Sequence, residues 1–155
     1  MFERYPESSR RALLLAKGTA LAADARSIDA EHLLAGALEV WPGAGSRREK
    51  ILRRLGLIVP RELPEQTSPE IPFSAVVQRL LNSAMMRADR LGHHRIRPEH
   101  LLLALLEDAT CTPSSLLQEA GLEPEMLLQS AARDALADDS PLSYRAYLEV
   151  KISRE

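Results

Sequence analysis

The stretch Ile28-Asp29-Ala30-Glu31-His32-Leu33-Leu34 recurs later in the chain as Ile96-Arg97-Pro98-Glu99-His100-Leu101-Leu102. The two copies share the pattern Ile-x-x-Glu-His-Leu-Leu and lie 68 residues apart (96 − 28 = 68). At that shift residues 5–40 align with 73–108 without a gap, and 11 of the 36 aligned positions are identical. Solenoids have shorter periods and need several repeats, so two copies at this spacing predict a duplicated domain with a pseudo-twofold axis.

Each copy carries the patterns of two helices. Apolar or small residues recur in steps of four and three at positions 9, 13, 16, 20 and 23, and again at 77, 81, 84, 88 and 91. This spacing predicts one long amphipathic helix per copy, and its central alanines would let a neighbouring helix approach closely. The second helix begins at the repeated motif, where Asp29 is a favourable N-cap and Pro98 fits the first helical position. We therefore predict an all-α fold of two similar four-helix-type halves.

Glycines and prolines predict where the helices end. Gly56 and Gly121 each close an apolar run and are expected to stop a helix in the left-handed conformation. A fourth helix is expected near the end of the second copy, whereas three prolines interrupt its counterpart in the first copy. We expect these boundaries, with both repeats in one compact domain: repeat 1 at 1–58, a linker at 59–70, repeat 2 at 71–137 and a tail at 138–155. The tail segment 144–152 fits either a helix or a short strand.

The composition excludes several classes of protein. The 20 basic and 22 acidic residues give a net charge of −2, which argues against nucleic acid as a partner because proteins that bind it carry a basic domain. The longest apolar run, 101–106, is too short for a membrane span of about 20 residues, and the charged start lacks the apolar segment of a signal peptide. The single cysteine, Cys111, excludes an internal disulfide. These features predict a cytoplasmic protein that does not bind a membrane.

The four histidines and the cysteine form no recognisable metal or catalytic motif. A reversed zinc-protease motif would need a histidine three residues before Glu99, but Ile96 occupies that position. The spacing of the remaining candidates does not fit a structural zinc site. We expect His32 and His100 to pack and hydrogen-bond in the first turns of equivalent helices. Cys111 is interpreted as a small residue without a catalytic partner.

The chain resembles the Clp repeat, the duplicated helical amino-terminal domain of Clp-type ATP-dependent unfoldases. Besides the paired motif, the resemblance rests on three stretches: Met1-Phe2-Glu3-Arg4-Tyr5, Ile71-Pro72-Phe73-Ser74 and Leu91-Gly92-His93. It covers nearly the whole chain and looks closest to the ClpC-type domain. In that family the domain is not catalytic; it docks adaptor proteins and captures substrates for the attached ATPase ring. The resemblance therefore implies protein partners, no cofactor and no enzymatic activity.

Some members of that family recognise phosphorylated arginine, and the resemblance places this site at the repeated glutamate. Glu99 would pair with the guanidinium, while Ser74 and the amides after it would receive the phosphate. Glu31 would form a weaker site, because Pro6 stands where the family usually has a cap threonine and has no amide hydrogen. From the residues alone, the simpler interpretation of Glu31 and Glu99 is compensation of the helix dipole.

The chain also departs from the unfoldases. None of its seven glycines precedes a lysine, so it has no phosphate-binding loop, and we expect it neither to bind nucleotide nor to unfold proteins by itself. We predict a non-catalytic module that recognises adaptors or substrates for ATP-dependent proteolysis. A decoy or regulator of a Clp unfoldase, or an N-terminal fragment of one, stays an open alternative; a metal-dependent hydrolase is a much weaker one. The partner and the oligomeric state are left open.

Overall fold

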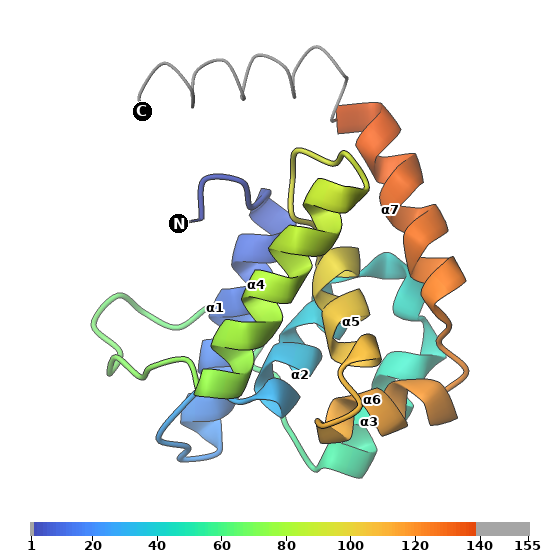
Figure 1. The fold of residues 1–155 in the computed structure, drawn as a ribbon. Helices are drawn as coiled ribbons and strands as arrows, with labels where there is room; N and C mark the ends of the chain where they lie inside the picture. Colours follow the sequence, from blue (N-terminus) through green and yellow to red (C-terminus); the bar gives the residue numbers. More distant parts are fainter. Residues whose placement is uncertain (1, 139–155) are drawn as a thin grey trace.

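The structure, a computed structural model, describes residues 2–138 of the chain (Figure 1). Its helices are α1 (Glu7–Ala22), α2 (Ala30–Val40), the short 3-10 helix η1 (Pro42–Ala44), α3 (Ser46–Leu55), α4 (Ala75–Arg90), α5 (Pro98–Glu107), α6 (Thr112–Glu119) and α7 (Pro124–Asp138). Over these residues the only β pairing is one isolated bridge between Ile28 and Phe73. The prediction of an all-α fold is therefore confirmed. None of the helices within 2–138 is long and apolar enough to cross a membrane.

α2 and α5 occupy the centre of the fold (Figure 1). Most side chains of both helices are buried, and a helix that is apolar on most sides is stable only when other helices surround it. α1 packs on α2, α4 packs on α5, the two central helices contact each other, and α7 covers α5. Leu33 and Leu34 of α2 and Leu101 and Leu102 of α5 belong to the same hydrophobic core. The first half (α1–α3) and the second half (α4–α7) are thus held together by one core.

The helices end as the sequence predicts. Gly56 and Gly121 follow α3 and α6 with positive φ angles of 68° and 78°, so both are left-handed helix stops. Asp29 is the N-cap of α2, and Pro98 is the first residue of α5. α7 is the fourth helix expected in the second half, and no helix lies between α3 and α4, where the linker was expected. The tail segment 144–152 lies outside the described residues.

The segment that precedes the long helix of each half binds the other half. The amide of Ile28 donates to the carbonyl of Pro72 at 2.8 Å, and the amide of Ile96 donates to the carbonyl of Arg4 at 3.0 Å. At the 68-residue shift Arg4 is equivalent to Pro72 and Ile28 to Ile96, so the two hydrogen bonds are equivalent as well. Reciprocal bonds of this kind agree with a duplication. The superposition of the two halves and the boundaries of the repeats stay predictions.

Small residues allow the helices to approach closely. The alanines expected at the helix crossings are fully buried: Ala16, Ala20, Ala84 and Ala88. The closest approach, which the sequence analysis did not identify, is at Gly36 of α2, where a Cβ atom would lie 2.1 Å from the carbonyl oxygen of Ala12 in α1. Only glycine permits that contact. The equivalent position in the second half is Ala104.

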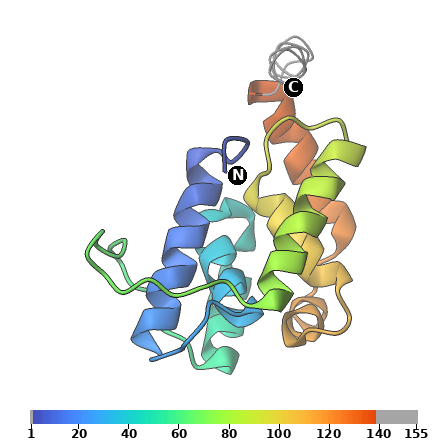
Figure 2. The same ribbon diagram turned by 60° about the vertical axis from the view of Figure 1, so that its left-hand side comes forward.

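The segment between α3 and α4 runs across α1 (Figure 2). Pro60 and Pro64 pack there against Gly18, where an added Cβ would lie 3.2 Å from Pro60 Cγ. The prolines that prevent a fourth helix in the first half therefore also pack against its first helix.

Candidate protein-binding site

Three helix N-termini meet at one open pocket of about 270 Å³. The start of α2 contributes Asp29, Ala30 and Glu31, the start of α4 contributes Ser74 and Val76, and the start of α6 contributes Thr110, Cys111 and Thr112. The first amides of a helix lack intrahelical partners and carry the positive end of its dipole. These amides can donate to an anionic group, and the carboxylates of Asp29 and Glu31, which also line the pocket, can pair with a cationic group.

Ser74 is held at this pocket by two hydrogen bonds. Its amide donates to the carbonyl of Ile28 at 3.0 Å, which joins the start of α4 to the segment just before α2. Its Oγ accepts from the amide of Val77 at 3.2 Å, so Ser74 is the N-cap of α4 as expected. A hydroxyl that accepts a hydrogen bond still has its own hydrogen to donate. Ser74 can therefore offer one hydrogen bond to a ligand.

Glu31 lies half-buried in the first turn of α2. That turn is fixed from both sides: the amide of Asp29 donates to His32 Nδ1 at 2.9 Å, and Ser27 Oγ donates to Asp29 Oδ1 at 3.0 Å. Glu31 is thereby presented to the pocket that Ser74 also lines. The glutamate of the first copy and the serine of the second copy share one pocket.

Glu99 does not line this pocket, contrary to the expected partnership of Glu99 with Ser74. The physical reason is the exchange of segments between the halves, since the amide of Ser74 binds Ile28 next to the helix that carries Glu31. The start of α4 therefore faces the central helix of the first half, not that of its own half. In the structure Ser74 therefore shares a pocket with Glu31 and not with Glu99, and the roles of these three residues in ligand binding stay predictions.

Glu99 is instead buried against α7, and its side chain is only 1% exposed. Ser130 Oγ donates to Glu99 Oε2 at 3.0 Å, and the indole Nε1 of Trp41 donates to Ser130 Oγ at 3.1 Å. Burial above all, and then a hydrogen bond with Asp134, raises the pKa of Glu99 to about 7. Sequence reasoning missed this chain of hydrogen bonds, because nothing in the local sequence links Trp41 with Ser130.

The start of α6 forms the third side of the pocket, which the sequence analysis also missed. Thr110 and Arg79 both bind the carboxylate of Asp108, with Arg79 Nη2 2.7 Å from Oδ2, and these hydrogen bonds lower the pKa of Asp108. Cys111 Sγ donates to the carbonyl of Asp108 at 3.1 Å. Burial raises the pKa of the Cys111 thiol, which keeps it in the protonated form and a weak nucleophile.

The repeated histidines have structural roles. His100 Nδ1 accepts from the amide of Arg97 at 2.8 Å, so its hydrogen is on Nε2, which lies 3.0 Å from His93 Nδ1 and donates to it. Burial, followed by the charge of His93, lowers the pKa of His100 to about 3, so the ring is neutral. His32 accepts from the amide of Asp29 in the same way. The predicted first-turn hydrogen bonds are confirmed, and across residues 2–138 no group of acidic, histidine and cysteine side chains is arranged to hold a metal ion.

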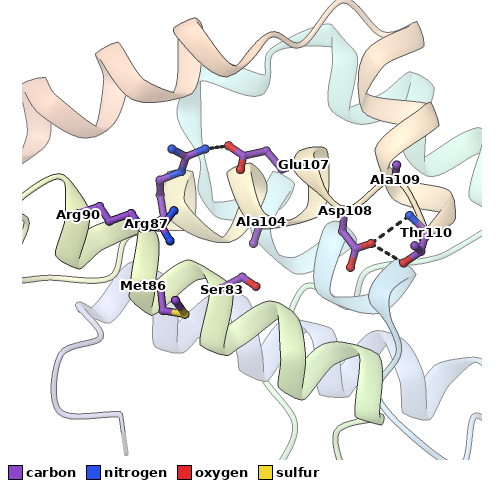
Figure 3. Close-up of a pocket in the computed structure, with 9 residues that line it drawn as sticks. All are labelled: Ser83, Met86, Arg87, Arg90, Ala104, Glu107, Asp108, Ala109 and Thr110. Atoms are coloured by element: carbon purple, nitrogen blue, oxygen red, sulfur yellow. Dashed lines mark hydrogen bonds and ion pairs between the residues drawn. The ribbon is translucent and has the colours of Figure 1, made fainter.

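Further grooves lie on the surface of the described residues, among them two that are larger than the Glu31 pocket. One, of about 490 Å³, lies between α4 and α5 (Figure 3), where Arg87 pairs with Glu107 and Asp108 binds Thr110. The other, of about 320 Å³, is mainly apolar and is lined by Phe2, Leu13, Leu14, Ile28, Ile71 and Phe73, together with Arg10, Lys17 and Glu70. Ile28 and Phe73 form the bridge next to Asp29 and Ser74, so the apolar groove adjoins the Glu31 pocket.

Solved structures of other proteins share this fold. The N-terminal domain of the caseinolytic protease associated chaperone ClpD from Arabidopsis thaliana matches with a TM-score of 0.64 and 21% identity, over 86% of this chain and 96% of that one. The N-terminal domain of Hsp104 from Candida albicans matches with a TM-score of 0.59 and 21% identity, over 83% and 89% of the two chains. The fold is therefore that of the N-terminal domains of Clp-type chaperones.

The family follows from the sequence comparisons. Residues 72–154 match the model of the Clp repeat (R) N-terminal domain, and the chain belongs to this family. It is 35% identical to the uncharacterized protein Rv2667 of Mycobacterium tuberculosis, over 68% of this chain and 44% of that protein. It is 27% identical to the chloroplastic chaperone protein ClpC1 of Oryza sativa subsp. japonica, over 79% of this chain and 14% of that protein. The chain thus spans less than half the length of these relatives.

Proposed function

We propose that the chain is a non-catalytic module that captures adaptor or substrate proteins for a Clp-type ATPase. Its membership of the Clp repeat family supports this function. The observation that carries the proposal is the pocket at which the N-termini of α2, α4 and α6 converge around Glu31. This arrangement offers amides to a negative group and a carboxylate to a positive group, and it contains no nucleophile activated for chemistry.

A phosphorylated arginine side chain fits both parts of this pocket. Its phosphate would receive hydrogen bonds from the helix amides and from the Ser74 hydroxyl, and its guanidinium would pair with the Glu31 carboxylate. An unmodified arginine would use only the carboxylate. A phosphoserine would use only the amides and would meet repulsion from Glu31. The pocket therefore favours a ligand that carries both charges next to each other.

The apolar groove beside the pocket supports a peptide as the larger ligand. It adjoins the pocket at the Ile28–Phe73 bridge and is lined mainly by apolar side chains. Leu14, one of the apolar side chains that line this groove, is exposed to solvent. A peptide that places one charged side chain in the Glu31 pocket would bury a neighbouring apolar side chain in the groove. Burial of apolar surface would then add to the charge-assisted bonds.

The test is a direct comparison of two labelled peptides that differ only in phosphorylation of one arginine, measured by fluorescence anisotropy. We expect the phosphorylated peptide to bind more tightly. Glu31→Gln should weaken its binding by roughly 10- to 150-fold, which corresponds to the loss of a charge-assisted hydrogen bond. Glu125→Gln, an exposed substitution in α7, is the matched control and should leave the affinity unchanged. Equal affinity for the two peptides would refute the proposed ligand.

A further inference from the structure

The Glu31 pocket has an equivalent position in the second half. At the 68-residue shift Glu31 corresponds to Glu99, and Ser74 corresponds to Pro6. If the two halves were equally built, a second pocket would be centred on Glu99. The two positions differ in every feature that the proposed ligand needs.

The first difference is access. Glu31 is half-buried and lines an open pocket, whereas Glu99 is 1% exposed. The indole of Trp41 and the hydroxyl of Ser130, which are 5% and 8% exposed as residues, close over Glu99 through the hydrogen bonds described above. α7 supplies Ser130, and no helix occupies the corresponding place between α3 and α4 in the first half. The fourth helix thus covers one glutamate and leaves the other uncovered.

The second difference is the set of donors. Ser74 has a hydroxyl at the start of α4 that can donate to a ligand, and its backbone amide joins α4 to the carbonyl of Ile28, whereas Pro6 at the start of α1 has neither group. The third difference is the state of the carboxylate. The Glu99 carboxylate faces groups of α7, where Ser130 donates to Oε2 and Asp134 shares a hydrogen bond. A guanidinium could reach Glu99 only after α7 and Trp41 had moved away.

We infer that this chain has one ligand site of the Glu31 type. The equivalent residue, Glu99, binds no ligand and instead joins α5 to α7 and Trp41 through buried hydrogen bonds. The inference rests on the proposed function, because it concerns the number of sites for the same ligand. It makes the chain monovalent: each copy of the chain holds one phosphorylated arginine. Two phosphorylated side chains of one substrate would need two copies of the chain.

Calorimetric titration of free phosphoarginine into the full chain tests this inference. We expect one equivalent to bind. Glu31→Gln should lower the affinity at least tenfold, whereas Glu99→Gln, which retains the shape of the side chain and an oxygen that can accept from Ser130, should leave stoichiometry and affinity within twofold of the parent chain. Circular dichroism and thermal melting of both variants verify that each is folded.

Trp41 provides an independent readout because it is the only tryptophan in the chain. Ligand in the Glu31 pocket should leave its emission maximum unchanged, whereas ligand at Glu99 would displace the indole into water and shift the emission to the red. Two equivalents, a red shift, or loss of binding in Glu99→Gln would each overturn the inference while the proposed function stands. No binding by the parent chain would overturn both.

Discussion

The hydroxyl of Ser9 donates a hydrogen bond of 2.7 Å to the backbone carbonyl of Ile96, at a buried position between the two halves. The equivalent carbonyl, that of Ile28, accepts at 3.0 Å from the amide of Ser74. Pro6 occupies the position equivalent to Ser74 and has no amide hydrogen. The side chain of Ser9 therefore supplies the donor that the backbone of the first half lacks.

Ser9→Ala should lower the free energy of unfolding by about 1–3 kcal/mol, because it leaves a buried carbonyl without its donor. The same substitution should cost less in a Pro6→Ser background. Pro6 has φ −67° and ψ 169°, close to −63° and 163° at Ser74, so a new amide at position 6 could donate to Ile96. Denaturant unfolding of the single and double variants measures the difference. An equal loss in both backgrounds would contradict this account.

Gly36→Ala should destabilise the chain by about 1–3 kcal/mol, since the added methyl would overlap the Ala12 carbonyl and separate α1 from α2. The matched control is Ala104→Gly at the equivalent position of α5, which creates no overlap and should cost about 1 kcal/mol in helix propensity and roughly 0.8 kcal/mol for the loss of a buried methyl group. Thermal melting of both variants provides the comparison. A larger loss at position 104 than at position 36 would show that the close approach of α1 and α2 is not essential.

The turn that follows the long helix, α1 in the first half and α4 in the second, contains a different residue at the same left-handed position. Asp24 has a φ angle of 55°, and its equivalent, Gly92, has a φ angle of 72°. A side chain in this left-handed region costs roughly 1–2 kcal/mol, and somewhat less for aspartate. Asp24→Gly should therefore stabilise the chain by up to about 1 kcal/mol, and Gly92→Ala should destabilise it. Unfolding energies that change in the same direction would disagree with the observed backbone.

Glu99 should make stability depend on pH. Its pKa is raised from an ordinary 4.5 to about 7, mainly by burial, so between those values the folded chain binds a proton that the unfolded chain has released. Stability should then fall as pH rises through this range and level off above it. Relative to Glu99→Gln, the parent chain should lose roughly 2–3 kcal/mol between pH 5 and pH 8.

Urea unfolding at both pH values, followed through Trp41, measures this dependence. The parent chain and the Glu99→Gln variant contain the same titratable groups apart from Glu99. The difference between their free energies of unfolding at each pH therefore reports the titration of Glu99 and its coupling to Asp134. Identical pH profiles would mean that Glu99 stays ionised in the folded chain.

Much of the fold could be predicted because its signals are local in sequence. Caps such as Asp29 and Pro98, stops such as Gly56 and Gly121, and the spacing of apolar residues all act within one helix. Gly36 was not identified, because its contact is with the backbone of another helix. No pattern within α2 distinguishes a glycine at a crossing from one that is merely tolerated.

The site could be predicted only in part. Glu31 and Ser74 were both recognised as candidates, but the sequence repeat does not say whether the start of α4 meets its own central helix or that of the other half. The hydrogen bond from Ser74 to Ile28 settles the geometry in favour of the other half. The burial of Glu99 depends on Trp41 and Ser130, which are far apart in sequence and are joined only by tertiary packing.

The central claim is that ligands bind where three helix N-termini meet around Glu31. Amide chemical-shift mapping of the ¹⁵N-labelled chain with an arginine-phosphorylated peptide tests it most directly. We predict that the largest shifts fall at residues 29–31, 74–76 and 110–112, with little change at 97–100. Shifts concentrated at 97–100, or the same shifts with the unphosphorylated peptide, would contradict it.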